Sequence, residues 1–295
     1  DSTQDNVNLP PDNELPNYKD DEINSGIPYI PGQEDDDDFE KLVMQRFDLS
    51  LRKFITAVNG EELLAEDGTY LRAPIVDVTP LVNGTGTTAI YNHTKIPVGV
   101  QVGDEVVYTI RVYNEGEVAG YANEIVDHLP PELEFLPDDE LNKQYGWELD
   151  ANDTTGRTIR TKYLSFETNA QDNLIEAFDK DTMETLDYKE VKVKCKVRTT
   201  QETGKKITNI ADITEYKDEN GNVATDIDSD AGNVVLPTDD NLPNYKDDEI
   251  NSGADYIPGQ EDDDDFEKLV MKKFDLSLRK FITSVNGEEL VDENG

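Results

Sequence analysis

The chain repeats itself at an offset of 227 residues, and this repeat constrains its architecture more than any other feature of the sequence. Of the 49 residues from Leu15 to Leu63, 44 are identical to those from Leu242 to Leu290. The 295 residues therefore span one full unit of a tandem array, with the end of the preceding unit and the start of the next. Arrays of large, near-identical units usually build length, because each unit contacts mainly its neighbours. We expect the partners to be neighbouring repeats of the same chain and, in a fibre, like chains.

The net charge of −39 is concentrated in two segments that are largely copies of each other. Residues 1–40 carry thirteen acids and one lysine, and residues 226–267 carry fifteen acids and one lysine. So acidic a chain repels nucleic acid and anionic lipid, which excludes nucleic-acid binding. No window of 18 apolar residues occurs, so we expect no membrane insertion. The single cysteine excludes a disulfide framework and a four-cysteine zinc site, and two histidines leave little for a histidine-based catalytic or metal centre.

Between the acidic segments, apolar and polar residues alternate with the period of β-strands. The expected strands are 47–55, 105–113, 124–129, 191–197 and 207–213. Residues 172–179 are instead typical of a short helix. Many strands separated by turn residues over about 190 residues favour an all-β fold, an elaborated immunoglobulin-like β-sandwich.

The repeat and the strand pattern together divide the chain into four parts. Residues 1–39 are expected to be the tail of the preceding repeat with an acidic linker, and residues 40–237 the sandwich. Residues 238–265 are expected to be a second acidic linker, and residues 266–295 the first strand or strands of the next repeat.

Three polar residues lie on the apolar faces of the expected strands. Lys53, Asp127 and Asn209 each share a face with the apolar residues of their own strand. A buried charge without a partner costs several kcal/mol, so such residues must be paired or neutralised. One interpretation is a buried Lys–Asp ion pair with a hydrogen bond to the asparagine, or an error in the assigned register.

The other interpretation is that the three residues react. An apolar pocket lowers the pKa of a lysine and makes the neutral, nucleophilic amine available. A carboxyl group in the same pocket has a raised pKa, so Asp127 could polarise the asparagine carbonyl and transfer the proton. Attack of the Lys53 amine on the side-chain carbon of Asn209 would expel ammonia and leave an intramolecular isopeptide bond. This event occurs once per molecule and is autocatalytic maturation, so we do not expect an enzyme.

Four blocks of the chain resemble the isopeptide-forming repeat domains of Gram-positive fimbrial and cell-wall-anchored adhesins. The blocks are FDLSLRKFIT at 47–56, VGDEVVYTIRVYNEGEVAG at 102–120, IVDHLPPELEF at 125–135 and ITNIADI at 207–213. In that family a first-strand lysine, the aspartate before a Leu-Pro turn and a last-strand asparagine form the cross-link, which implies Lys53, Asp127 and Asn209 here. His128 departs from the family pattern, in which threonine or serine is expected.

The resemblance implies a structural stalk or spacer repeat of a bacterial adhesin or fibre, located outside the cell at the surface or wall. The alternative is an adhesin module that binds a host protein or glycan. The cross-link would close a loop of 156 residues, worth about 5 kcal/mol. We expect a pull on the two ends to pass through the bond and bypass the sheet. Lys280, the same lysine in the next unit, is predicted to remain unreacted.

The second acidic segment also suggests a cation site. The candidate ligands are Asp226, Asp228, Asp230, Asp262, Asp263, Asp264 and Asp265. Carboxylates in excess suit Ca²⁺, which takes six to eight oxygen ligands, although Ala231 stands where an EF-hand loop needs glycine. A calcium site at the interdomain junction is therefore one interpretation, and a solvated acidic linker is the other. The cross-link itself needs no cofactor.

Overall fold

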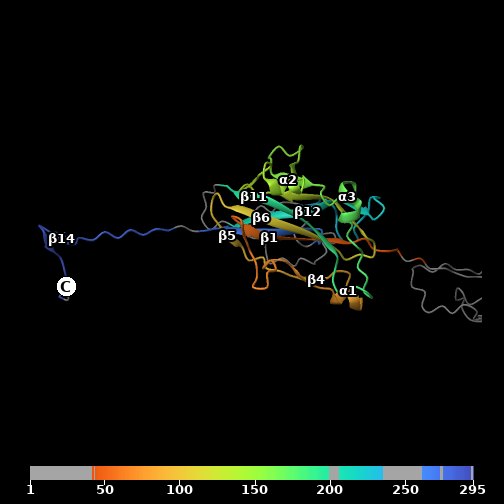
Figure 1. The fold of residues 1–295 in the computed structure, drawn as a ribbon, viewed down its shortest axis with the longest axis horizontal. Coiled ribbons are helices and arrows are strands. Elements are labelled where there is room, and N and C mark those ends of the chain that lie inside the picture. The colour runs from red at the N-terminus through yellow and green to blue at the C-terminus, as the bar shows by residue number, and fades with distance from the viewer. Residues whose placement is uncertain (1–41, 43, 199–205, 235–260, 273–274, 294) are drawn as a thin grey trace, which may run out of the picture. The chain divides into compact units, whose positions relative to one another are not determined.

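The computed structural model describes residues 42, 44–198, 206–234, 261–272, 275–293 and 295, and its main feature is a pair of β-sheets around one core (Figure 1). The sandwich belongs to a compact unit formed by Arg46–Gly295. The predicted tail and linker at 1–39 lie outside the described residues, as do residues 238–260 of the second predicted linker. In the described part of the chain, no helix is long and apolar enough to cross a membrane.

The first sheet has five strands in the order β2-β1-β6-β11-β8, all antiparallel to their neighbours. These strands are β1 (Leu49–Val58), β2 (Glu61–Glu62), β6 (Glu105–Asn114), β8 (Leu133–Phe135) and β11 (Tyr188–Val197).

The second sheet has six strands in the order β5-β13-β12-β7-β10-β9, and only the pair of β5 and β13 is parallel within it. These strands are β5 (Val98–Val100), β7 (Gly120–His128), β9 (Glu148–Leu149), β10 (Thr158–Thr161), β12 (Lys206–Asp218) and β13 (Asp264–Met271).

The inner faces of the two sheets form the main core, so the predicted all-β sandwich is confirmed. Leu51 and Ile110 of the first sheet and Ile125 and Ile213 of the second belong to one buried apolar cluster. Because strand side chains alternate between faces, the apolar residues that recur every second position all reach this interior. The five strands expected from that alternation correspond to β1, β6, β7, β11 and β12.

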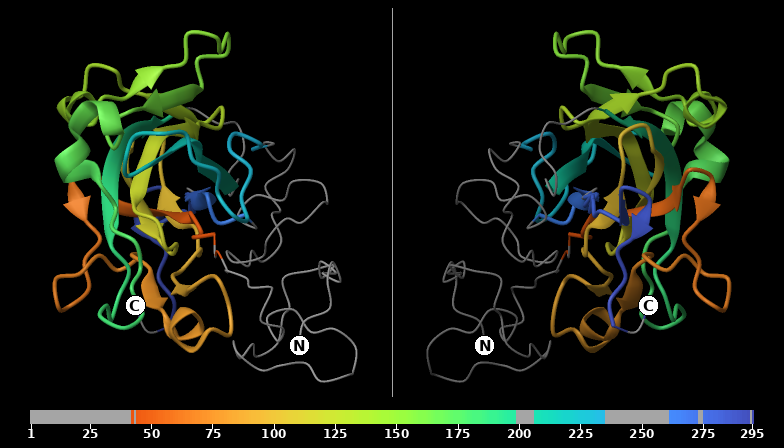
Figure 2. Two further views of the ribbon diagram at one scale, coloured as in Figure 1. Left: turned by 90° about the vertical axis from the view of Figure 1, so that its right-hand side faces the viewer. Right: turned by 90° about the vertical axis from the view of Figure 1, so that its left-hand side faces the viewer.

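The described residues also include short elements outside the two sheets. They are α1 (Thr79–Asn83), α2 (Glu140–Gln144), α3 (Phe166–Asn173), β3 (Ile75–Asp77), β4 (Ile90–Asn92), β14 (Ser284–Val285) and β15 (Glu288–Glu289). The ribbons of α1 and α3 lie at the edge of the fold in both views of Figure 2.

The helix predicted at 172–179 is wrong, because the helix of this region, α3, lies earlier in the chain. Ser165 caps its N-terminus by accepting a hydrogen bond from the Thr168 amide. Ile175, in the middle of the predicted helix, instead forms an isolated β-bridge with Gly120 and is fully buried. Pairing with β7 therefore overrides the local helical pattern.

The polar face of β1 is buried as well, because a second apolar cluster covers it. This cluster contains Leu81, Ala89, Tyr91, Tyr113 and Leu186. Arg52 of β1 lies 3.9 Å from the centre of the Tyr91 ring, and the hydroxyls of Ser50 and Tyr91 share a hydrogen bond of 2.7 Å. Both faces of β1 are therefore packed against other residues, one against the main core and the other against this second cluster.

Strand β13 changes the predicted end of the domain. Its residues were assigned to the acidic linker and to the next repeat, but β13 pairs with β12 from Asp212↔Asp264 to Lys206↔Val270 and runs parallel to β5. The side chains of the acidic run have partners in the same unit: Asp263 bonds to the Tyr216 hydroxyl, Asp265 to Lys95, and Glu267 to Arg72. Residues 261–271 are thus part of this sandwich, not a solvated linker.

The copy of β1 that follows β13 has no such surroundings. Leu276, Leu278 and Phe281 are more than three-quarters exposed, whereas Leu49, Leu51 and Phe54 at the equivalent positions are fully buried. The Asn-Gly turn that joins β1 to β2 recurs between β14 and β15, where Asn286 has φ 51° and Gly287 has φ 87°. This segment therefore has the same local turn as the start of a repeat, but its apolar side chains are not packed against a core.

Gly120, at the start of β7, offers a direct test of this packing. A Cβ atom added there would lie 2.3 Å from Cε2 of Phe47 and 2.5 Å from the Lys217 carbonyl oxygen. We expect Gly120→Ala to lower the free energy of unfolding by about 1–3 kcal/mol through overpacking. Chemical denaturation of the full chain measures this. Gly99→Ala is the control, because its Cβ would contact only the flexible Lys272 side chain and should cost far less.

Candidate functional site

Lys53, Asp127 and Asn209 meet in the interior between the two sheets. Lys53 comes from β1 of the first sheet, and Asp127 and Asn209 come from the adjacent strands β7 and β12 of the second. Asp127 pairs with Ala211 across these strands, and Asn209 lies two residues before Ala211. The period of two therefore puts the Asp127 and Asn209 side chains on the same inward face.

The aspartate stands between the lysine and the asparagine. Lys53 Nζ lies 2.7 Å from Asp127 Oδ2, and Asn209 Nδ2 donates a long hydrogen bond of 3.5 Å to the same oxygen. One carboxylate oxygen thus contacts both the amine and the amide nitrogen. The structure thus brings together the three residues that the sequence placed on apolar strand faces.

All three side chains are fully buried, and burial controls their acid–base behaviour. Desolvation lowers the pKa of Lys53, against the opposing attraction of the Asp127 charge. Desolvation also raises the pKa of Asp127, against the attraction of Lys53. Both shifts favour a neutral amine beside a neutral carboxylic acid, because each charged form is disfavoured away from water.

The polar atoms of this site are not all satisfied. Oδ1 of Asp127 and Oδ1 of Asn209 have no hydrogen-bond partner among the described residues. Lys53 Nζ lies 5.0 Å from the centre of the Tyr108 ring. Cys195 of β11 is also fully buried, and the charges of Asp127 and Lys53 affect the pKa of its thiol. A buried polar group left unpaired costs about 1–3 kcal/mol, so this interior is costly as a purely structural arrangement.

A second group of acidic residues lies near the start of β1. Asp48, Asp226, Asp228 and Asp262 each place a carboxylate oxygen within 4.8 Å of the others. Three of these aspartates were among the predicted ligands. Asp48 was not, because it lies on the face of β1 opposite Lys53 and gave no sequence signal apart from its charge.

The remaining predicted ligands lie elsewhere. Asp263 and Asp265 bond to Tyr216 and Lys95, and Asp264 begins β13 as a pairing partner of Asp212. Asp230 is exposed. The structure therefore gathers Asp226, Asp228 and Asp262 from the predicted set and adds Asp48.

Burial strongly affects the titration of this acidic group. It raises the pKa of Asp48 to about 10, and the charges of Asp228 and Glu115 act in the same direction. Burial also raises the pKa of Asp226 to about 8. Carboxylates in such surroundings must bind protons or another cation to be stable.

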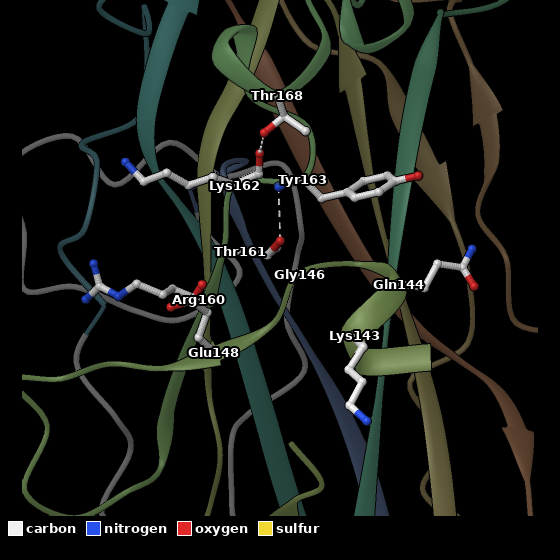
Figure 3. A pocket seen from close by; sticks show the side chains of 9 residues that line it. All are labelled: Lys143, Gln144, Gly146, Glu148, Arg160, Thr161, Lys162, Tyr163 and Thr168. Carbon is white, nitrogen blue, oxygen red and sulfur yellow. Dashed lines mark hydrogen bonds between the residues drawn. The ribbon is translucent and has the colours of Figure 1, made fainter. Parts of the chain in front are cut away.

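A pocket of about 520 Å³ lies apart from both groups, beside α2, β10 and the start of α3 (Figure 3). Its lining residues are Lys143, Gln144, Gly146, Glu148, Arg160, Thr161, Lys162, Tyr163 and Thr168. Arg160 is already paired with Glu124 and Asp150, and Lys162 with Glu215. The pocket's cations are therefore engaged by the protein itself.

Comparisons with known proteins yield resemblances among solved structures. No family model matches the chain, and no curated protein matches it. The major pilin subunit BcpA of Bacillus cereus is 13% identical with a TM-score of 0.27, and the match covers 60% of this chain and 37% of the pilin. A type II cohesin domain of Acetivibrio cellulolyticus is 14% identical with a TM-score of 0.25, covering 52% of this chain and 86% of the cohesin. The collagen-binding domain of a Staphylococcus aureus adhesin is 9% identical with a TM-score of 0.20, covering 69% of this chain and 99% of that domain.

Proposed function

We propose that the chain is a structural repeat of a bacterial surface fibre or adhesin stalk, and that each repeat matures by forming one isopeptide bond between Lys53 and Asn209. The observation that carries the proposal is the contact of one Asp127 oxygen with both the Lys53 amine and the Asn209 amide, with all three side chains fully buried between the sheets. The tandem repeat supports a role in building length. Such a stalk would stand outside the cell, at the surface or wall.

The proposed reaction starts from the two contacts of Asp127 Oδ2. Asp127 Oδ2 takes a proton from the Lys53 ammonium, and the neutral Nζ attacks Cγ of Asn209. The Cγ–Nδ2 bond breaks as the Cγ–Nζ bond forms, and Asp127 delivers its proton to the departing nitrogen. Asp127 then takes the second proton that Nζ loses, so it ends as the neutral acid. The products are one secondary amide and one molecule of ammonia, so no oxidant or cofactor is required.

Energetics also favour reaction over a permanent ion pair. Removing a lysine and an aspartate from water costs several kcal/mol for each charge, which a single contact of 2.7 Å does not fully return. Cross-linking removes the ammonium altogether and leaves Asp127 free to be neutral. The raised pKa of Asp127 suits that state.

The intact mass of the purified full chain tests the proposal. We expect it to be about 17 Da below the mass calculated from the sequence, because acyl transfer from Asn209 to Lys53 releases one ammonia. Lys53→Ala should have its full calculated mass. Lys280→Ala, which changes the exposed counterpart of Lys53 in the next repeat, should still lose about 17 Da.

A full mass for the unaltered chain would reject the cross-link. Lys53 and Asp127 would then be a structural ion pair, and a module that binds a host protein or glycan would become the better proposal. Peptide mapping adds a second check, because the cross-link must join the peptide containing Lys53 to the one containing Asn209.

A further inference from the structure

We infer that Asp48, Asp226, Asp228 and Asp262 bind one Ca²⁺ ion, which fastens the segment leading into β13 to the start of β1. This inference is independent of the proposed cross-link, since none of its four residues takes part in that reaction. The sequence suggested a calcium site at the junction between domains, whereas the site inferred here lies within one sandwich. Asp48, which directly precedes β1, is the fourth ligand residue.

The four aspartates come from three segments that are far apart in the sequence. Asp48 immediately precedes β1, Asp226 and Asp228 follow β12, and Asp262 precedes β13 by two residues. Their ligand oxygens lie within 4.8 Å of one another. Asp48 is 0% exposed, Asp262 4% and Asp226 6%, so the carboxylates face each other rather than water. Four ionised carboxylates this close repel one another strongly unless a proton or a cation lies among them, and a cation is the alternative that also supplies partners for their oxygens.

Most carboxylate oxygens of this group lack donors. Five of them, namely both of Asp48, both of Asp228 and Oδ2 of Asp262, are buried without a hydrogen-bond partner among the described residues. The other three have donors. Both oxygens of Asp226 accept from backbone amides, Oδ2 from Leu49 at 2.8 Å and Oδ1 from Asp228 at 3.3 Å, and Oδ1 of Asp262 accepts from the Ser229 hydroxyl at 2.8 Å. The five oxygens without donors are available as ligands.

The cations beside this group among the described residues do not balance its charge. Arg46 acts electrostatically on Asp48 and Asp228, but its ion pair, at 3.6 Å, is with Glu117. Arg52 contacts the group through the Asp262 carbonyl. Even with both guanidinium groups counted, the four carboxylates leave a formal excess of two negative charges, which one divalent cation balances.

The donor set selects calcium among common divalent ions. Every candidate ligand is a carboxylate oxygen, whereas zinc and copper sites in proteins usually include histidine or cysteine. Mg²⁺ keeps several waters and demands near-ideal octahedral geometry, which suits buried, crowded carboxylates poorly. Ca²⁺ accepts six to eight oxygens at varied angles, and five unpartnered oxygens with a few waters or carbonyls would supply them.

The proposed ion would strengthen an existing connection between β1 and the segment before β13. The Leu51 amide donates to the Asp262 carbonyl at 2.6 Å, and Arg52 Nη1 donates to the same carbonyl at 3.1 Å. The segment before β13 is therefore already attached to β1 through its backbone. An ion held by Asp48 and Asp262 joins the same two segments through their side chains, and Asp226 and Asp228 add the segment that follows β12.

Calorimetric titration of the chelator-treated full chain with CaCl₂, and separately with MgCl₂, tests the inference. We expect one tight Ca²⁺ per chain and much weaker Mg²⁺ binding. At a Ca²⁺ concentration about 100 times its Kd, the melting temperature should rise by roughly 5–10 °C. Asp48→Asn should abolish both effects. Asp275→Asn is the matched control, because Asp275 is the repeat counterpart of Asp48 and is exposed.

Hydrogen exchange provides a local readout. Ca²⁺ should slow exchange of the amides of β13 in the unaltered chain and in Asp275→Asn, but not in Asp48→Asn. Asp228→Asn, tested alongside with circular dichroism to check folding, covers the case in which Asp48→Asn fails to fold. Tight binding that survives both Asp48→Asn and Asp228→Asn would place the ion elsewhere and overturn the inference. So would the absence of tight binding to the unaltered chain.

Discussion

Asn209→Ala is expected to lower the free energy of unfolding by about 5 kcal/mol, because it removes the proposed cross-link, which would close the loop from Lys53. The closed loop spans 156 residues, and in the chain-entropy description a loop of that length restricts the unfolded state strongly. For a domain of this size the loss corresponds to a fall in melting temperature of roughly 10–20 °C. Differential scanning calorimetry of the full chain measures it.

The comparison needs a variant that changes a lysine without touching the site. Lys280→Ala fits, because Lys280 is exposed and repeats the sequence around Lys53. Its melting temperature should equal that of the unaltered chain. If Asn209→Ala also had that melting temperature while its mass showed no loss of ammonia, the bond would contribute nothing to stability and the proposed structural role would fail.

Asp127→Asn is expected to have the second large effect, because it removes the acid–base group while keeping the shape of the side chain. An amide cannot accept the proton of the Lys53 ammonium, so formation of the bond should slow by about 10²–10⁴-fold. The fully buried Lys53 would also lose its partner at 2.7 Å, which costs about 3–5 kcal/mol. A time course of intact mass after purification gives the rate, and chemical denaturation gives the stability.

Asp212→Asn is the control for this variant. Asp212 lies on β12 close to the site, but its partner is His128 at 2.9 Å. The variant should still lose about 17 Da at the rate of the unaltered chain. A normal rate in Asp127→Asn would show that Asp127 is only a counter-ion and that another group transfers the proton.

The strands and the three central residues could be predicted because they depend on a local pattern. A residue at an even offset from buried neighbours must share their face, so Lys53 was placed inside by Leu51 and Ile55 alone. The same rule placed Asp127 and Asn209. That the three would meet also required β7 and β12 to be neighbours in one sheet, which the strand pattern does not specify. The meeting was an interpretation of three buried polar residues, and the family resemblance then favoured it.

The acidic run was misassigned because its partners are distant in the sequence. EDDDDFE has the composition of a solvated linker when taken alone, and Lys268, which directly follows it, cannot balance its six acids. Its partners Arg72 and Lys95 lie about 170 to 195 residues earlier, in the segment between β2 and β5. Asp48 was not predicted as a ligand for the same reason, since it lies beside Asp262 only in the folded chain.

The position of β13 alters how a chain of these repeats would respond to tension. With Lys53 joined to Asn209, the loop between them has a fixed length, but the 71 residues from Asn209 to Lys280 of the next repeat lie outside it. A pull on the next repeat reaches β13 first, and β13 is held to β12 and β5 only by hydrogen bonds and side-chain contacts. The sequence-based expectation that tension bypasses the sheet therefore does not hold for this strand.

Each repeat would then extend in two stages under load. Below the force that detaches β13 its length is constant, and above that force it can lengthen until residues 219–280, which follow β12, are straight, which is roughly 200 Å. The load then passes through β12 to the covalent loop. When tension falls, β13 can pair again with an intact partner strand, so a stalk of such repeats would absorb a sudden pull reversibly while the rest of every domain stays folded.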